Sequence, residues 1–384
     1  MKMNSKKIGV VTFHFSANYG SALQCYALKK TLSLHGYDST VIDYCPSYQT
    51  VGYNTYNSFK DYCETQDNKN VFFLLMKNTA KNIKGFFNFA KRTKNKKYEK
   101  FRNDNLKLTR AYKHVKDIDD VFDIYISGSD QIWNYHCVRD KEYGGVYDKA
   151  YFLSFAQNKK KIAYAVSAQH GEIRTDLDED VLSLINQYDY ISTREAALTK
   201  TLHELGRADA VTVLDPTLLL DKKYYQCVEA KVGYKDDNYI LVYNLPGANS
   251  TLLESLIQKV AKQTGCSIVD ISPKPYAGLV SEKIKTCGPS EFLTYIHNAK
   301  YVLTDSFHAV AFSLIYHKNF FCVLREKNDE RIKNILSMSG LMDRLVESAD
   351  DEITEELIDF EAVDQKMRPA KEASIQFLLK GLGK

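Results

Sequence analysis

Long apolar runs, proline and tryptophan are scarce in this sequence. Its 384 residues include 7 prolines and one tryptophan, Trp133. No stretch approaches the roughly 18 consecutive apolar residues that a membrane-spanning helix requires. The basic residues 1–7 precede an apolar segment, residues 8–15, that is too short for a signal peptide and is interrupted by His14. We therefore expect a cytoplasmic protein whose first apolar segment forms a strand.

Several signatures of metal, cofactor and nucleophile sites are also missing. The eight cysteines include no close pair, so neither a zinc ribbon nor a disulfide scaffold is expected. The sequence contains no Walker loop, no His-Glu-x-x-His pair and no Gly-x-Ser-x-Gly elbow. Gly128-Ser129-Asp130 lacks the three spaced glycines of a dinucleotide fingerprint. The sequence thus predicts no metal and no cofactor.

The charge is nearly balanced in total but strongly divided along the chain. The formal net charge is +4. Residues 77–110 hold twelve Lys and Arg against two acidic residues, a local charge of +10, whereas residues 343–364 hold ten Asp and Glu against one Arg, a local charge of −9. A nucleic-acid binder usually carries positive charge over a whole domain face, so this division argues against nucleic acid as a partner.

Short apolar strands alternate with amphipathic helices through most of the chain, which predicts an α/β fold. A length of 384 residues is too great for one ordinary domain. We expect two doubly wound domains that face a cleft, residues 1–220 and 237–345, joined by a polar linker and followed by a C-terminal acidic segment and helix, residues 346–384. The expected strands are residues 7–13, 39–44, 123–127, 161–167, 188–193, 210–214, 239–243, 267–271, 301–304 and 320–324.

Residues 70–110 form a basic insert in the first domain. Their pattern predicts helices that bury the phenylalanines and turn the Lys and Arg side chains to solvent. A solvated helix face is the default interpretation of such a run, and contact with an anionic lipid headgroup or a charged glycan is the alternative.

Residues that follow the strands carry the functional information, because open α/β sheets bind ligands at the carboxyl ends of their strands. His308 follows an apolar strand and opens an apolar helix, where a neutral imidazole suits proton transfer. A capping or core histidine is the alternative. Arg194 follows another strand, where a guanidinium can clamp a phosphate or carboxylate. A salt bridge to Glu195 or to another carboxylate is its structural alternative.

Three further positions have both a functional and a structural interpretation. The turn at residues 16–21 delivers helix N–H groups that favour anions or sugar hydroxyls, but an ordinary capped turn fits equally well. Asp130 is either a catalytic base or the cap of the helix that it opens. Trp133 is either a platform for a sugar ring or an aromatic anchor of the core.

Five segments, taken together and in order, carry a family resemblance. The first comprises Thr12-Phe13-His14, Asn18-Tyr19-Gly20-Ser21-Ala22-Leu23-Gln24 and Tyr26-Ala27-Leu28. The others are Ser127-Gly128-Ser129-Asp130-Gln131-Ile132-Trp133-Asn134, Ser192-Thr193-Arg194-Glu195, Leu214-Asp215-Pro216-Thr217 and Thr304-Asp305-Ser306-Phe307-His308-Ala309. From residue 7 to residue 345, the chain resembles the polysaccharide pyruvyl transferase family.

This resemblance implies a GT-B-like fold of two Rossmann-like domains, and the transfer of the pyruvyl group of phosphoenolpyruvate onto a sugar as a ketal. The family's arginine corresponds to Arg194 and its histidine to His308. Many members carry Arg-Leu-His at the second site, where this chain has Ser306-Phe307-His308, so one positive charge of the donor pocket is missing. Arg325 or Arg331, which are near in sequence, could replace it. The difference leaves the donor and the product open.

We therefore expect a phosphoenolpyruvate-dependent, ketal-forming transferase that acts on a surface polysaccharide or its lipid-linked precursor. His308 is the expected general acid/base, and Arg194 the expected clamp on the donor. The expected substrate-binding residues are Asn18, Tyr19, Gly20, Ser129, Asp130, Trp133, Asn134, Asp305, Ser306 and Arg331. A peripheral contact with the inner face of the membrane is also expected. The alternatives are a GT-B glycosyltransferase with a nucleotide-sugar donor, or a non-catalytic glycan-binding relative.

Overall fold

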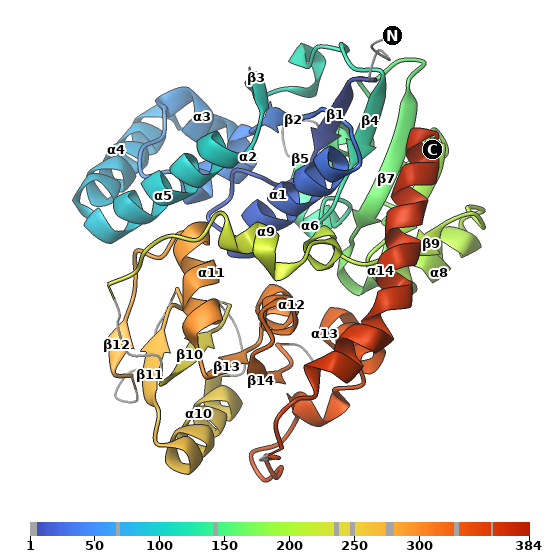
Figure 1. The fold of residues 1–384 in the computed structure, drawn as a ribbon. Helices are drawn as coiled ribbons and strands as arrows, with labels where there is room; N and C mark the ends of the chain where they lie inside the picture. Colours follow the sequence, from blue (N-terminus) through green and yellow to red (C-terminus); the bar gives the residue numbers. More distant parts are fainter. Residues whose placement is uncertain are drawn as a thin grey trace. The chain divides into compact units, whose positions relative to one another are not determined.

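The structure, a computed structural model, divides the chain into two compact units. It describes residues 6–66, 70–140, 145–233, 238–245, 250–273, 280–325, 330–354 and 356–384. Unit 1 comprises Met1–Leu219 and Ser374–Lys384, and unit 2 comprises Leu220–Ala373. Each unit is built on its own parallel sheet (Figure 1), so the predicted fold class is confirmed. Residue 237, where the second domain was expected to begin, lies outside the described residues.

Unit 1 has a seven-stranded sheet with the strand order β3-β2-β1-β4-β7-β8-β9, and all its strand pairs are parallel. The chain winds from β1 to β3 on one side of β1 and from β4 to β9 on the other side. The direction of winding therefore reverses between β1 and β4, which is the position where such sheets bind ligands. The strands are β1 (Ile8–Val11), β2 (Ser39–Tyr44), β3 (Leu108–Tyr112), β4 (Ile124–Ser127), β7 (Lys160–Val166), β8 (Tyr190–Thr193) and β9 (Val211–Thr212).

Helix α1 (Tyr19–Leu34) carries the chain from β1 to β2, and a side-chain cap fixes its start. Asn18 has an extended backbone, and its Oδ1 accepts a hydrogen bond from the Ser21 N–H at 3.3 Å. The other α-helices of unit 1 are α2 (Ser47–Tyr53), α3 (Phe59–Glu64), α4 (Val71–Phe87), α5 (Phe89–Asn105), α6 (Tyr135–Val138), α7 (Val181–Ile185) and α8 (Ala196–Glu204). Its short 3-10 helices are η1 (Val115–Asp117), η3 (Lys149–Phe152), η4 (Gln169–Gly171) and η5 (Pro216–Leu219), and β5 (Arg139–Asp140) pairs antiparallel with β6 (Val146–Tyr147).

The last turns of helix α14 (Phe360–Leu382) complete the core of unit 1. Phe377 packs against Tyr164 of β7 at 6.4 Å between ring centroids, and Leu378 is fully buried. The Ser374 hydroxyl accepts a hydrogen bond from the Leu214 N–H at 2.9 Å. The sequence analysis treated residues 346–384 as one C-terminal segment, but the structure divides α14 between the two units.

Unit 2 has a six-stranded parallel sheet with the order β12-β11-β10-β13-β14-β15, so its winding reverses between β10 and β13. Its core packs aliphatic residues of these strands against α10. The strands are β10 (Tyr239–Tyr243), β11 (Ser267–Asp270), β12 (Glu282–Lys283), β13 (Tyr301–Thr304), β14 (Asn319–Val323) and β15 (Leu345–Val346). The helices are α9 (Lys222–Gln226), α10 (Ser250–Thr264), α11 (Pro289–Asn298), α12 (Phe307–Tyr316), α13 (Glu330–Ser339), the 3-10 helix η6 (Met342–Arg344) and the first part of α14.

The basic insert differs from its prediction in two respects. It is helical, as α4 and α5, but only Phe101 of its six phenylalanines is buried, and the others are exposed: Phe72, Phe73, Phe86, Phe87 and Phe89. The end of the predicted helical region also forms an edge strand, β3. Among the helices in the described ranges, none is long and apolar enough to cross a membrane.

Candidate active site

The reversal point of the unit 1 sheet brings together the segments that follow β1 and β4. These two strands pair directly, so the turn at Asn18 and the turn at Ser129 lie at the same edge of the sheet. Ser21 Oγ donates a hydrogen bond to Asp130 Oδ2 at 2.6 Å, and both side chains are buried. The predicted residues Asn18, Ser129 and Asp130 therefore lie at the same edge of the unit 1 sheet.

Gln24 of α1 holds this position together. Its Nε2 donates to Thr12 Oγ1 at 2.9 Å and to the carbonyl oxygens of Phe13 and Ser21, both at 3.1 Å. Its Oε1 accepts a hydrogen bond from the Ser129 N–H at 3.1 Å, and Thr12 Oγ1 donates to the Ser129 carbonyl at 2.7 Å. Because Gln24 is completely buried, its amide fixes the turns after β1 and β4 relative to α1.

Arg194 lies at the centre of a buried ionic network at the same edge of the sheet. Its Nη1 donates to Asp215 Oδ2 at 3.0 Å, and its Nε donates to Glu195 Oε1 at 3.2 Å. Its Nη2 donates to Ser167 Oγ at 3.1 Å and lies 3.9 Å from Asp130 Oδ1. The Arg194 side chain is only 2% exposed. The network thus joins residues that follow β4, β7, β8 and β9.

The neighbouring carboxylates stabilise the charged form of the Arg194 guanidinium. Burial alone would lower the pKa of Arg194, but the negative charges of Glu195, Asp215 and Asp130 raise it above its ordinary value. Three carboxylates around one guanidinium leave the network formally at −2 when all are ionised. The sequence analysis expected Arg194 to clamp an anionic donor. The structure places it in the protein's own ion pairs, which was the alternative interpretation.

Trp133 and Asn134 follow the same β4 turn. The indole of Trp133 is completely buried, stacks on Phe152 at 5.2 Å between centroids and meets Tyr188 edge-on at 5.6 Å. It occupies the position of a core anchor and offers no face to solvent. Asn134 Oδ1 accepts a hydrogen bond from the His136 N–H at 3.0 Å and so caps α6.

Tyr19 and Gly20 form the first turn of α1, and both are buried. The ring of Tyr19 stacks on Tyr98 of α5 at 5.8 Å, and Lys94 Nζ lies 5.1 Å from the Tyr19 ring centroid. This stacking links the capped start of α1 to the basic insert. Through this stack, α5 contacts the first turn of α1, next to Asn18.

The reversal point of the unit 2 sheet collects the second set of predicted residues. Asp305 follows β13, is 1% exposed, and its Oδ1 accepts a hydrogen bond from the Leu245 N–H, beyond β10, at 2.8 Å. Thr304 Oγ1 donates to the Tyr243 carbonyl at 2.5 Å and accepts from the Ser306 N–H at 3.0 Å. Hydrogen bonds between side chains and backbone thereby join the ends of β10 and β13.

His308 is the second residue of α12, two positions after the N-cap Ser306. It is half-buried, whereas its neighbours Phe307 and Ala309 are buried, and its ring meets that of Phe307 edge-on at 5.2 Å. Arg331 is half-buried on α13, the helix that packs against α12, and Arg325 is exposed after β14. The structure therefore places Asp305, Ser306 and His308 at one edge of unit 2.

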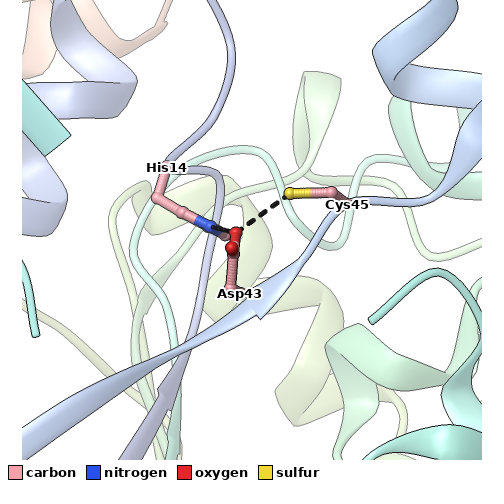
Figure 2. A group of neighbouring side chains, drawn as sticks. All are labelled: His14, Asp43 and Cys45. Carbon is pink, nitrogen blue, oxygen red and sulfur yellow. Dashed lines mark hydrogen bonds and ion pairs between the residues drawn. The ribbon is translucent and has the colours of Figure 1, made fainter. Parts of the chain in front are cut away.

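A third polar group, His14, Asp43 and Cys45, lies where the segment after β1 meets the end of β2. Figure 2 shows the imidazole and the thiol both directed at the carboxylate of Asp43. His14 Nε2 lies 2.8 Å and Cys45 Sγ 3.1 Å from Asp43 Oδ1, while His14 Nδ1 lies 3.0 Å from the Thr12 carbonyl. A doubly protonated imidazole ring would donate in both of its contacts.

Hydrogen bonding and burial shift the pKa of the Asp43 carboxyl in opposite directions. Burial alone would raise the pKa of the Asp43 carboxyl, but the hydrogen bond and charge of His14 and the hydrogen bond from Cys45 lower it below its ordinary value. Burial, and then the charge of Asp43, raise the pKa of the Cys45 thiol. Imidazole, carboxylate and thiolate are also the ligands that zinc prefers, and the three ligand atoms lie within 4.8 Å of one another. No metal site was expected from the sequence, because the cysteines are unpaired and His14 is 29 residues from Asp43.

A sequence model of the polysaccharide pyruvyl transferase family matches residues 18–327, most of the chain. The chain belongs to the polysaccharide pyruvyl transferase family. For this pyruvyl transferase family member, the match includes every predicted catalytic or substrate-binding residue except Arg331, and it leaves out His14. It also includes Gln24 and Asp215, whose parts in the buried networks were missed, and Glu195, which was named as a salt-bridge partner of Arg194. The signal for them was their presence in the motif segments, as polar residues between apolar ones.

The fold has several structural neighbours with low sequence identity. The UDP-GlcNAc 2-epimerase from Methanocaldococcus jannaschii is 11% identical, with a TM-score of 0.45 over 94% of this chain and 92% of that chain. An α-glucosyltransferase in complex with UDP-glucose and DNA is 10% identical, with a TM-score of 0.48 over 99% and 93%. A glycosyltransferase from Streptomyces sp. SF2575 is 11% identical, with a TM-score of 0.36 over 98% and 95%. No curated protein is significantly similar to this pyruvyl transferase family member in sequence.

Proposed function

We propose that this family member transfers the pyruvyl group of phosphoenolpyruvate to a pair of hydroxyls on one sugar of a surface polysaccharide or its lipid-linked precursor. The family membership supports a polysaccharide pyruvyl transferase in general. The observation that carries the specific proposal is that His308 opens α12 beside the reversal point of the unit 2 sheet. That position combines an imidazole with helix N–H groups, which suit an anionic substrate.

In this proposal, unit 2 binds the donor and His308 moves the protons. A sugar hydroxyl attacks C2 of phosphoenolpyruvate, its proton is removed, and the methylene carbon C3 receives a proton. The C2–O bond to phosphate then breaks, inorganic phosphate leaves, and a second hydroxyl of the same sugar bonds to C2. That hydroxyl releases its proton, so the products are a methyl-bearing ketal and phosphate. Ser306 and Arg331 are the proposed donor contacts in place of the family's additional arginine.

Unit 1 is proposed to bind the acceptor, with Arg194 as a positioning residue. Its guanidinium fixes Asp130, Ser167 and Asp215, which follow three strands of the sheet. Asp130 in turn accepts a hydrogen bond from Ser21 at the start of α1. Loss of Arg194 therefore disturbs the acceptor wall without removing a direct contact to phosphate. Asn18, Ser129 and Asn134 are the proposed acceptor contacts that this wall supports.

The test is a phosphate-release assay with phosphoenolpyruvate and a panel of sugar acceptors, lipid-linked ones included. We expect release that depends on both substrates and is reduced by about 10²-fold or more in His308→Ala, the scale of general acid/base catalysis. The matched control is His317→Asn at the other end of α12, because His317 has a left-handed backbone that asparagine tolerates. Full activity in a folded His308→Ala variant contradicts the assignment.

Ligand-induced stabilisation separates this proposal from its alternatives. A ligand that binds only the folded state stabilises it by RT ln(1 + L/Kd), where L is the ligand concentration, so the melting temperature rises with ligand concentration. Stabilisation by phosphoenolpyruvate supports the proposal. Stabilisation by a nucleotide-sugar and not by phosphoenolpyruvate identifies a glycosyltransferase, and stabilisation by glycans alone identifies a non-catalytic binding protein.

A further inference from the structure

Helix α4 presents its apolar residues to solvent. In the part of the chain that the structure describes, 17 large apolar residues are exposed, and more than half of them lie between residues 71 and 89. Several are exposed over most of their surface, with Phe87 at 77%, Phe89 at 76% and Phe72 at 73%. An exposed aromatic surface of this size on one short segment usually marks an interaction site.

Three polar residues of α4, Asn78, Lys81 and Asn82, face the protein instead. Asn82 makes a reciprocal pair with Asn57, in which its Nδ2 donates to the Asn57 carbonyl and its Oδ1 accepts from the Asn57 N–H, both at 2.9 Å. Asn78 Nδ2 donates to the same carbonyl at 3.3 Å, and Lys81 Nζ donates to the Val51 carbonyl at 2.9 Å. Hydrogen bonds therefore hold much of the protein-facing side of α4, and Leu74 is its one buried apolar residue.

Most of the exposed apolar residues of α4 lie on one side of the helix. At about 100° per residue, six of them fall within a sector of about 120°. They are Phe72, Leu75, Met76, Ile83, Phe86 and Phe87. Leu74 and Asn78, the buried residues of α4, lie on the opposite side of the helix. We call these six residues the apolar stripe.

Basic residues border the apolar stripe. Lys77 Nζ lies 4.2 Å from the ring centroid of Phe73, and the Arg92 guanidinium lies 5.0 Å from that of Phe86. Helices α4 and α5 together carry ten Lys and Arg against Glu99 and Asp104, a net charge of +8. An apolar face with a basic border is the pattern of a helix that lies in the interface of an anionic bilayer.

We propose that the apolar stripe of α4 binds the surface of a membrane that contains anionic lipids. The charge decides between a bilayer and a second copy of this chain. Two copies joined through the stripe would bring two surfaces of +8 together, whereas anionic headgroups neutralise the same charge. Residues 71–87 form a helix with one apolar side and a basic border, so the aromatic side chains enter the acyl boundary while the lysines remain among the headgroups.

This binding bears on the proposed function without depending on it. If the acceptor is lipid-linked, which rests on the proposed function, the stripe brings unit 1 to the surface where that acceptor lies. Vesicle binding and phosphate release are measured separately. Failure of the membrane proposal therefore leaves the transferase proposal standing, and the reverse also holds.

The test is flotation of the full chain with vesicles of two compositions. One is phosphatidylcholine alone, and the other is phosphatidylcholine with phosphatidylglycerol at about 2:1. We expect binding to the anionic vesicles that weakens when salt is raised from about 0.1 M to about 0.5 M, because the Debye length shortens. Equal binding to both vesicles, or none to either, overturns the proposal.

Two variant sets locate the surface. Phe86→Ser/Phe87→Ser is expected to weaken anionic vesicle binding by about tenfold or more, since burial of even one Phe contributes a factor of that size. The matched control is Val121→Ser/Leu357→Ser, which removes two exposed apolar residues outside the stripe. Lys77→Gln and Lys84→Gln are expected to cost about fivefold each. A Phe86→Ser/Phe87→Ser chain that binds like the control pair overturns the assignment.

A tryptophan probe gives a direct readout of insertion. Trp133 is the only tryptophan and is completely buried, so Phe87→Trp adds one exposed reporter against a constant background. We expect the added emission to shift to shorter wavelength with anionic vesicles and to remain unchanged with neutral ones. Sedimentation equilibrium tests the alternative, in which the stripe binds a second copy of this chain. A dimer that Phe86→Ser/Phe87→Ser converts to monomer, with no shift on vesicles, assigns the stripe to self-association and overturns the proposal.

Discussion

Replacement of Arg194 by methionine is the perturbation whose outcome the structure predicts most sharply. Methionine keeps much of the side-chain volume but removes the charge and the donors. It leaves Asp215 and Glu195, whose side chains are 0% and 5% exposed, without their cationic partner. Removing one member of a buried ion pair costs about 3 to 5 kcal/mol, because an uncompensated charge remains in a medium of low dielectric constant. Domains are stable by about 5 to 15 kcal/mol, so unit 1 should lose a large part of its stability.

Arg174→Met is the matched control for this substitution. Arg174 pairs with Asp176 at 2.7 Å, a shorter distance than in the Arg194–Asp215 pair, but these side chains are 35% and 61% exposed. An exposed pair contributes about 0 to 1 kcal/mol. Urea unfolding followed by Trp133 fluorescence reports unit 1, because that indole lies in its core. Similar midpoints for the two variants would refute the reasoning.

Two additional variants separate a structural role for Arg194 from contact with the donor. Arg194→Met/Asp215→Asn should recover part of the lost stability, with a coupling energy above about 1 kcal/mol, since the unpaired charge has been removed. Arg194→Lys keeps the charge but loses the planar fork, so an intermediate stability is expected. If Arg194→Lys instead raises the KM for phosphoenolpyruvate with an unchanged unfolding midpoint, Arg194 binds the donor directly.

Gly128→Ala should disrupt unit 1, because Gly128 has a φ of +129° and a Cβ there would meet a β7 carbonyl oxygen at 2.0 Å. The control is Gly206→Ala, since Gly206 also has a positive φ but a Cβ there would meet open space. In thermal melts, the control should lose only about 1 kcal/mol of stability. Asp43→Asn should be less stable than wild type at neutral pH. The lowered pKa of Asp43 gives stability that is complete above about pH 4 and is lost as pH falls through the folded-state value, so the two urea midpoints should converge in acid. Iodoacetamide should label exposed Cys227 before Cys45, whose pKa is raised, and equal rates by mass spectrometry would contradict this.

The strands could be predicted from sequence because each central strand is an apolar run with polar residues at its ends. Ile8–Val11 and Tyr239–Tyr243 are buried along their whole length, as central parallel strands are, so hydrophobicity alone identifies them. Helix α4 shows where this signal fails. Its periodicity gives a helix with an apolar side, but it does not say which side contacts the protein. Asn78 and Asn82 face inward because the carbonyl of Asn57, distant in sequence, is there to accept their hydrogen bonds.

The positions of the candidate site residues in the fold could be predicted from the sequence. Their roles could be predicted less well. His308 and Asp130 follow strands, and the strand order confirms that such segments lie at the reversal points. Glu195 could be named as a partner of Arg194, but Asp130 and Asp215 could not, because they come from different strand ends whose proximity depends on the order of strands in the sheet. The contact between His14 and Asp43 has the same origin.

The division of α14 between the two units affects how the protein is synthesised. Residues 374–384 emerge from the ribosome only after all of unit 2, a delay on the order of ten seconds at ordinary elongation rates. Until then, the face of β7 that Phe377 covers is open, and the Leu214 N–H lacks the Ser374 hydroxyl. Unit 2 can fold as one continuous stretch during this interval. Unit 1 emerges first from the ribosome and is completed last.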